Sequence, residues 1–185
     1  MMLTRYSNIV VFGFMGTGKS TAARRVAHEL ARRYVDIDRL IEEREGCSIA
    51  ELFEAKGEAA FREMEHEVVK EVAAGEGQVI ATGGGVILRE DNVQALSRDS
   101  LMVCLDASLE TILERTGRNA NRPLLQAPDR EERIKALLEE RKPLYARIPV
   151  HISTDDRPNG LVARMIVALF HEEVLKSGGY TPPPV

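Results

Sequence analysis

Residues 13–20 read Gly-Phe-Met-Gly-Thr-Gly-Lys-Ser (GFMGTGKS), which matches the phosphate-loop pattern G-x-x-x-x-G-K-[ST]. Residues 8–12, just before this loop, form a mainly β-branched run that predicts a buried strand of a parallel sheet. Residues 19–32 repeat small and apolar side chains at helical spacing. A strand, a glycine loop and a helix in this order predict that the loop binds phosphate and opens a βαβ unit.

Each residue type in this loop suits the binding of ATP. Glycines let successive N–H groups face phosphate oxygens, and the helix N-terminus adds its positive end. Lys19 brings a charge near the transferring group, and Ser20 offers a hydroxyl to a magnesium ion that bridges the phosphates. The alternative is a flexible turn with an incidental lysine, which the flanking strand and helix disfavour. The residues of this segment predicted to bind ATP are Gly13, Met15, Gly16, Thr17, Gly18, Lys19, Ser20 and Thr21.

The composition of the chain argues against several other classes of binding partner. A chain of 185 residues that is 44% hydrophobic predicts one compact domain, and a formal net charge of -4 excludes the broad positive field typical of nucleic-acid binding. The two cysteines and four histidines are scattered without metal-ligand spacing. No apolar run approaches the ~20 residues that span a bilayer, and the N-terminus lacks the layout of a secretory signal. We therefore expect a cytoplasmic monomer that binds neither nucleic acid nor membrane.

Strands and helices alternate along the rest of the chain. Further strands are predicted at 34–38, 79–82, 101–105 and 150–153, with helices between them and a capping box at Ser48 and Glu51. One predicted helix spans 58–74, and another begins at Asp129 and ends at Pro143. The pattern predicts a three-layer α/β/α fold with a mainly parallel, five-stranded sheet. We expect a single domain at 1–178, a mobile lid at about 117–128 and a disordered tail at 179–185.

Two acidic residues lie at the end of the second predicted strand. Asp36 and Asp38 are two apart, so on an extended strand both side chains point to the same side, near the edge where ligands of open α/β sheets bind. One could hold magnesium through water while the other orients an attacking hydroxyl or accepts its proton. The alternative is that Asp38 caps the helix that begins near Leu40.

Three glycines, Gly83, Gly84 and Gly85, follow the third predicted strand. Bare backbone at the carboxyl end of a strand lets a ligand approach closely. A loose turn is the alternative interpretation, because glycine is common in loops.

The motifs GFMGTGKS, DID, GEAAFREME, GGG, RPLL and ERKPLY occur in this order. In this combination the chain resembles the shikimate kinase family over nearly its whole length, a family of P-loop small-metabolite kinases similar to nucleoside monophosphate kinases. The resemblance implies transfer of the γ-phosphoryl group of ATP to the 3-hydroxyl of shikimate, with Mg²⁺ as cofactor. Strand three ends in Thr82 rather than a Walker B aspartate, so magnesium would rely on Ser20 and Asp36.

The resemblance also implies roles for single residues. Lys19, Asp38 and Arg122 would be catalytic, with Asp38 contacting the ring hydroxyls and Arg122 reaching over the phosphates from the lid. The residues flanking the adenine would be Arg115 and Arg157. Those lining the shikimate pocket would be Asp38, Arg62, Gly83, Gly84, Gly85 and Arg141, of which the two arginines clamp the substrate carboxylate and Glu65 holds Arg62.

Other interpretations remain open at this point. Without the resemblance, Arg62 would be a partner of Glu65 one helical turn away, and Arg141 a cation at a helix C-terminus. A kinase for another sugar-like acid such as gluconate is the nearest competing enzyme, against which the arginine pair and the GGG motif argue. A nucleotide-binding regulatory protein without phosphoryl transfer is the alternative from another class.

Overall fold

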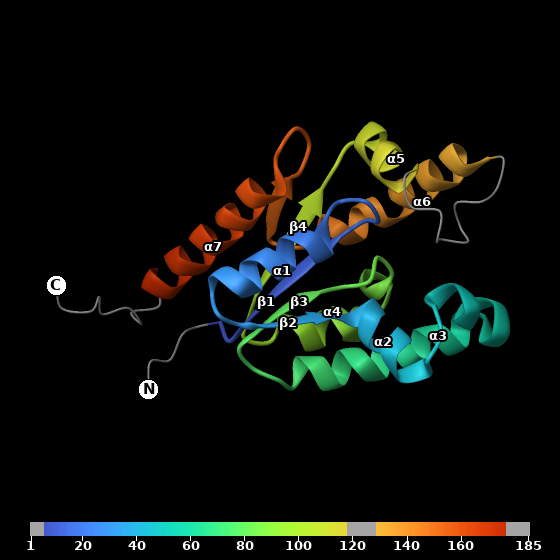
Figure 1. The fold of residues 1–185 in the computed structure, drawn as a ribbon, viewed down its shortest axis with the longest axis horizontal. Helices are drawn as coiled ribbons and strands as arrows, with labels where there is room; N and C mark the ends of the chain where they lie inside the picture. The colour runs from blue at the N-terminus through green and yellow to red at the C-terminus, as the bar shows by residue number, and fades with distance from the viewer. Residues whose placement is uncertain (1–5, 118–128, 177–185) are drawn as a thin grey trace.

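The structure, a computed structural model, describes residues 6–117 and 129–176. Its sheet contains β1 (Asn8–Gly13), β2 (Arg33–Asp36), β3 (Gln78–Ala81), β4 (Ser100–Asp106) and β5 (Val150–Ser153). The strands are all parallel, in the order β2-β3-β1-β4-β5. The predicted five-stranded parallel sheet is therefore confirmed (Figure 1).

Two helical layers cover the sheet because successive strand residues face opposite sides. On β1, Ile9 and Val11 pack against α1 (Lys19–Glu29) and α7 (Asn159–Lys176), which lie together on one face. Val10 and Phe12 face the other core. That core is closed by α2 (Ile37–Glu45), α3 (Ile49–Ala73), α4 (Glu90–Ser97), α5 (Leu109–Gly117), α6 (Arg130–Tyr145) and the short 3₁₀ turn η1 (Val86–Leu88). This is the predicted three-layer α/β/α arrangement.

The boundary between β2 and α2 differs from the prediction. The strand ends at Asp36 rather than Asp38, because the Asp36 side chain caps α2 by accepting a hydrogen bond from the Arg39 amide at 3.3 Å. Asp38 lies in the first turn of the helix. The prediction that both aspartates share one face of a strand is wrong, and so is the alternative in which Asp38 provides the cap.

One predicted helix is longer in the structure and another keeps its predicted start. Helix α3 begins after the confirmed capping box of Ser48 and Glu51 and is interrupted at Gly57, where φ is 80° and ψ is 169°, so its second part begins at Glu58 as predicted. Helix α6 continues past Pro143 to Tyr145. A proline so close to a helix end removes few backbone hydrogen bonds, so the last turn still forms. Arg141 and Tyr145 are consequently one turn apart on the same helix.

Some predictions fall on residues that the structure does not describe. The lid is expected at about 117–128, and of this range only Gly117 at the end of α5 belongs to the described residues. Arg122 and the tail at 179–185 lie outside them. Among the described helices, none is long and apolar enough to cross a membrane.

Candidate active site

The phosphate loop joins β1 to α1 at the carboxyl edge of the sheet, and one carbonyl organises it. The Phe14 oxygen accepts hydrogen bonds from the Thr17 hydroxyl at 2.8 Å and from the Lys19 ammonium at 2.9 Å. Gly18 caps α1 with φ at 89°, a left-handed conformation that favours glycine. Lys19 is buried, while Ser20 is exposed at the start of the helix. This geometry positions the lysine before any ligand binds.

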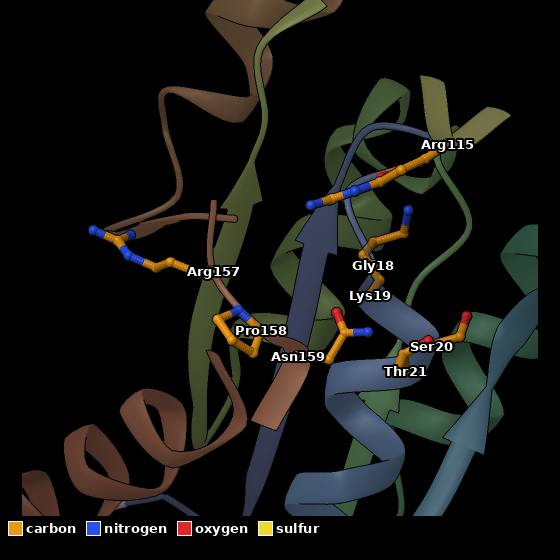
Figure 2. A pocket seen from close by; sticks show the side chains of 9 residues that line it. Gly18, Lys19, Ser20, Thr21, Arg115, Arg157, Pro158 and Asn159 are labelled. Atoms are coloured by element: carbon orange, nitrogen blue, oxygen red, sulfur yellow. The ribbon is translucent and has the colours of Figure 1, made fainter. Parts of the chain in front are cut away.

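A cavity of about 480 Å³ lies beside this loop (Figure 2). Its lining residues come from the loop and α1, from α5, from the segment between β5 and α7, and from the first residue of α7. They are Gly16, Gly18, Lys19, Ser20, Thr21, Arg115, Arg157, Pro158 and Asn159. Seven of these nine were predicted to bind ATP. The other predicted residues of the loop, Gly13, Met15 and Thr17, are buried in it and do not line the cavity.

The two arginines predicted to flank the adenine differ in how they are held. Arg115 donates to Gly16 O at 3.3 Å and to the hydroxyl and carbonyl of Thr154 at 2.9 Å each. It therefore ties the phosphate loop to the end of β5. Arg157 is exposed and donates to Ser153 O at 2.6 Å, and in Figure 2 it lies apart from Lys19 and Arg115. Pro158 and Asn159, which sequence reasoning missed, complete this wall.

Ser20 and Asp36, the predicted magnesium residues, lie on α1 and at the end of β2. One Asp36 oxygen caps α2, and the other accepts a hydrogen bond from the Tyr34 hydroxyl at 2.8 Å. Thr82 donates to Val11 O at 3.2 Å and is buried, so its hydroxyl is engaged with β1. Serine and aspartate oxygens are suitable ligands for a hard cation.

The GGG segment lies where the acceptor was predicted to bind, and each glycine faces a different charged residue. A methyl group added to Gly83 would overlap the Asp38 carboxylate, and one added to Gly85 would overlap the Arg62 guanidinium. At Gly84 it would lie 3.9 Å from Arg141 Nη1. The tertiary structure thus brings Asp38, Arg62 and Arg141 from three helices to one stretch of bare backbone.

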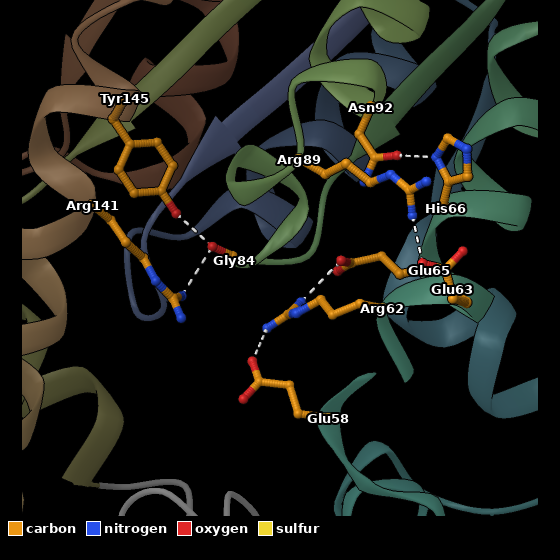
Figure 3. Close-up of polar contacts among 10 residues, drawn as sticks. All are labelled: Glu58, Arg62, Glu63, Glu65, His66, Gly84, Arg89, Asn92, Arg141 and Tyr145. Atoms are coloured by element: carbon orange, nitrogen blue, oxygen red, sulfur yellow. Dashed lines mark hydrogen bonds and ion pairs between the residues drawn. The ribbon is translucent and has the colours of Figure 1, made fainter. Parts of the chain in front are cut away.

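The two predicted clamp arginines have different supports (Figure 3). Arg62 contacts Glu65 at 2.9 Å and Glu58 at 3.1 Å. Arg141 is buried and donates from Nη1 to Gly84 O at 3.1 Å, while its Nε finds no hydrogen-bond partner among the described residues. Figure 3 shows both guanidinium groups turned toward the space beside Gly84. A buried, incompletely satisfied guanidinium is a strong site for an anion.

Glu65 has an unusual environment for an acid. Its side chain is almost fully buried against Arg62, and its Oε1 would lie 3.2 Å from a methyl group on Gly83. Burial raises the pKa of Glu65 above the ordinary value of 4.5 and outweighs the opposing effect of Arg62. The nearby charge of Asp38 raises this pKa further, and that of Arg141 lowers it.

Tyr145 was not singled out by sequence reasoning, although it ends the ERKPLY motif. Its buried hydroxyl contacts two carbonyl oxygens, Gly84 O at 2.8 Å and Gly13 O at 3.1 Å. Burial raises the pKa of this phenol, so it remains a donor at neutral pH. Tyr145 therefore joins the start of the phosphate loop to the GGG segment, and only the folded chain reveals this contact.

Within the described residues, one cluster has the ligand types of a metal site, formed by Cys104, Asp106 and His151. Asp106 already contacts His151 Nδ1 at 2.7 Å, and burial raises the pKa of the Cys104 thiol. Thiol and imidazole are not the ligands that magnesium prefers. The cluster also lies on β4 and β5, across β1 from Asp36. It is therefore not the predicted magnesium site.

A phosphate loop beside an arginine-lined pocket, on the carboxyl edge of a parallel sheet, defines a P-loop kinase of small anionic molecules. A family model described as Shikimate kinase matches residues 15–171. The shikimate kinase of Thermodesulfovibrio yellowstonii is 45% identical over 160 residues, which cover 86% of this chain and 92% of that protein. That of Symbiobacterium thermophilum is 47% identical over 153 residues, covering 81% and 88%. The chain belongs to the shikimate kinase family.

Solved structures agree with this assignment. Shikimate kinase from Acinetobacter baumannii in complex with shikimate aligns with a TM-score of 0.88 and 36% identity, covering 93% of this chain and 97% of that one. A gluconokinase from Sinorhizobium meliloti aligns with a TM-score of 0.63 and 16% identity, covering 95% and 97%. At that identity the second likeness shows a shared fold alone.

Proposed function

We propose that this chain transfers the γ-phosphoryl group of ATP to the 3-hydroxyl of shikimate, giving shikimate 3-phosphate and ADP. The observation that carries the proposal is the meeting of Asp38, Arg62 and Arg141 around the GGG segment, next to the phosphate loop. Shikimate has one carboxylate and three ring hydroxyls, and this pocket offers two guanidinium groups and one carboxylate. The pocket therefore complements both the charge and the hydroxyls of the acceptor.

The nucleotide half supplies charge stabilisation. The Lys19 ammonium has three donors, so it can keep its bond to Phe14 O and still face a phosphate oxygen. Negative charge spreads over the transferring group in the transition state, so Lys19 contributes more than proton removal does. Arg115 and Arg157 would border the base, and Arg122 would reach the phosphates.

The acceptor half supplies orientation. Arg62 and Arg141 would hold the carboxylate through paired hydrogen bonds, which fix its direction as well as its charge. Asp38 would then receive the 3-hydroxyl and orient it or accept its proton. The ring would rest against Gly83, Gly84 and Gly85, and a methyl group at Gly83 or Gly85 would overlap the Asp38 carboxylate or the Arg62 guanidinium.

Ser20 and Asp36 would hold Mg²⁺, Ser20 through its hydroxyl and Asp36 through water. Both offer oxygen, and few protein ligands are needed because magnesium usually keeps waters and phosphate oxygens in its coordination shell. When bound, the ion would neutralise charge on the phosphates. We expect shikimate and ATP to be the partners of a cytoplasmic monomer.

The test is coupled release of ADP by the purified full chain with ATP and magnesium. Shikimate, gluconate and a sample without acceptor are compared, and we expect release with shikimate alone. Release with gluconate at a similar rate would assign a broader acid kinase. Slow release that does not depend on an acceptor would instead indicate a nucleotide-binding protein without this transfer.

A further inference from the structure

Tyr34 is a residue of β2 that the assignment above does not use. It lies two residues before Asp36, so on an extended strand the two side chains point to the same side. Its hydroxyl donates to Asp36 Oδ2 at 2.8 Å, while Asp36 Oδ1 accepts from the Arg39 amide at 3.3 Å. Each oxygen of this carboxylate is therefore held by a different donor.

Tyr34 also contacts α1, the helix that carries Ser20. The Arg24 guanidinium carbon lies 5.3 Å from the centre of the Tyr34 ring. Tyr34 therefore contacts both the helix that carries Ser20 and the Asp36 carboxylate.

We infer that Tyr34 is a positioning residue for magnesium binding, whose hydroxyl orients the Asp36 carboxylate. This rests on the proposed function, which assigns Ser20 and Asp36 to the ion. With the helix cap alone, the carboxylate is held by one oxygen and its plane is free to turn. The hydrogen bond from Tyr34 holds the second oxygen and thereby the plane of the group.

Orientation matters for this ion in particular. Magnesium demands near-octahedral geometry and gives up its waters reluctantly, so a carboxylate that acts through water must present its oxygen in a set direction. Loss of a residue that orients a metal-binding group typically costs about 10- to 100-fold in metal affinity. Asp36 is expected to bind through water rather than directly, so we expect the lower end of that range.

The experiment is a calorimetric titration of ADP into the full chain at a series of Mg²⁺ concentrations. Tyr34→Phe, Asp36→Asn and the double variant are compared with the wild type. Tyr34→Phe is expected to raise the half-saturating Mg²⁺ concentration about tenfold. Affinity for ADP without magnesium should stay unchanged, because the phosphate loop is not altered. Asparagine caps helices as well as aspartate, so Asp36→Asn preserves α2.

The double variant separates positioning from general disturbance. If Tyr34 acts through Asp36, adding Tyr34→Phe to Asp36→Asn produces no further change in the Mg²⁺ dependence. Tyr6→Phe is the matched control, since Tyr6 packs on the α1 and α7 core and should leave the Mg²⁺ dependence as in the wild type.

Three outcomes overturn the inference. An unchanged Mg²⁺ dependence in Tyr34→Phe, while Asp36→Asn shifts it, refutes the role of Tyr34 and leaves the proposed metal site intact. If Tyr34→Phe shifts the Mg²⁺ dependence as much in the Asp36→Asn variant as in the wild type, Tyr34 does not act through Asp36. If neither single variant shifts the Mg²⁺ dependence, the assignment of Asp36 to magnesium fails, and the role of Tyr34 falls with it.

Discussion

The proposed nucleotide half and the proposed acceptor half of this site are built in different ways. The nucleotide half centres on one continuous segment, the loop between β1 and α1, whose backbone and Lys19 are positioned by the Phe14 carbonyl. The acceptor half takes Asp38 from α2, Arg62 from α3 and Arg141 from α6, and gathers them around a glycine segment. The first depends on local backbone geometry and the second on how separate helices pack.

Because the two halves are built differently, substitutions in each half are expected to have different effects. Changes in the loop should act on the rate of transfer, while changes among the helices should act on capture of the acceptor. Tyr145 contacts both halves, through Gly13 and Gly84, and is therefore one structural link between them. The following substitutions test the separation, from the largest expected effect to the smallest.

Lys19→Ala should have the largest effect. Removing the charge that faces the transferring group is expected to lower kcat on the order of 10²- to 10³-fold, the typical cost of losing one transition-state donor. The Michaelis constant for shikimate should change little, because Lys19 lies in the other half of the site. Steady-state kinetics of ADP release measures both quantities. A comparable loss of shikimate affinity would show that the two halves are not separable.

Arg141→Ala should act on the opposite half. A hydrogen bond to a charged group contributes about 1.5–3 kcal/mol, so the Michaelis constant for shikimate should rise roughly 10- to 100-fold. Affinity for ADP should remain as in the wild type. Arg141→Lys is the matched control and should recover only part of the loss, because lysine lacks the planar fork. An unchanged Michaelis constant in Arg141→Ala would refute the clamp.

Gly83→Ala tests the packing of the acceptor half without removing a charge. The added methyl group overlaps Asp38 Oδ1 and lies 3.2 Å from Glu65 Oε1, so the Asp38 carboxylate must move. A displacement of this kind is expected to lower kcat/KM for shikimate at least about tenfold. Gly46→Ala is the control. Gly46 has a left-handed φ of 69°, and a methyl group added there would have no neighbour within 4 Å. This substitution should lower stability and leave kcat/KM alone.

Glu65→Gln should have the smallest effect, seen in the pH dependence of stability. The pKa of Glu65 is raised in the folded chain, so between the ordinary value of 4.5 and the raised value the folded state binds more protons than the unfolded state. The stabilising contribution is present below pH 4.5 and is lost as pH rises through the folded pKa. The stability of the wild type relative to Glu65→Gln should therefore fall as pH rises.

Urea denaturation of both proteins at pH 5 and pH 8 measures this difference. If the wild type instead became more stable relative to Glu65→Gln as pH rises, the ion pair with Arg62 would outweigh the burial of Glu65. The ion pair is 2.9 Å long, but the acid is almost fully buried, so burial is expected to dominate.

Local chemistry explains why much of the fold was predictable. The phosphate loop, the buried strands and the capping box of Ser48 and Glu51 each depend on residues adjacent or nearly adjacent in the chain. The errors came where two local preferences compete. Asp36 suits both the end of a strand and a helix cap, and the structure shows that the cap ends β2 two residues early. Pro143 is a helix breaker by type, yet close to a helix end it is tolerated.

By itself the sequence determined the phosphate loop and the order of the strands, and through resemblance it predicted residues for an acceptor pocket. Only the tertiary structure decided that Gly83 faces Asp38 and Glu65, that Tyr145 joins Gly13 to Gly84, and that Tyr34 and the cap of α2 hold the two oxygens of Asp36. The physical reason is the sequence separation of the residues that interact. Backbone conformation and capping arise within a few residues, whereas burial and contacts between elements arise from packing residues distant in sequence.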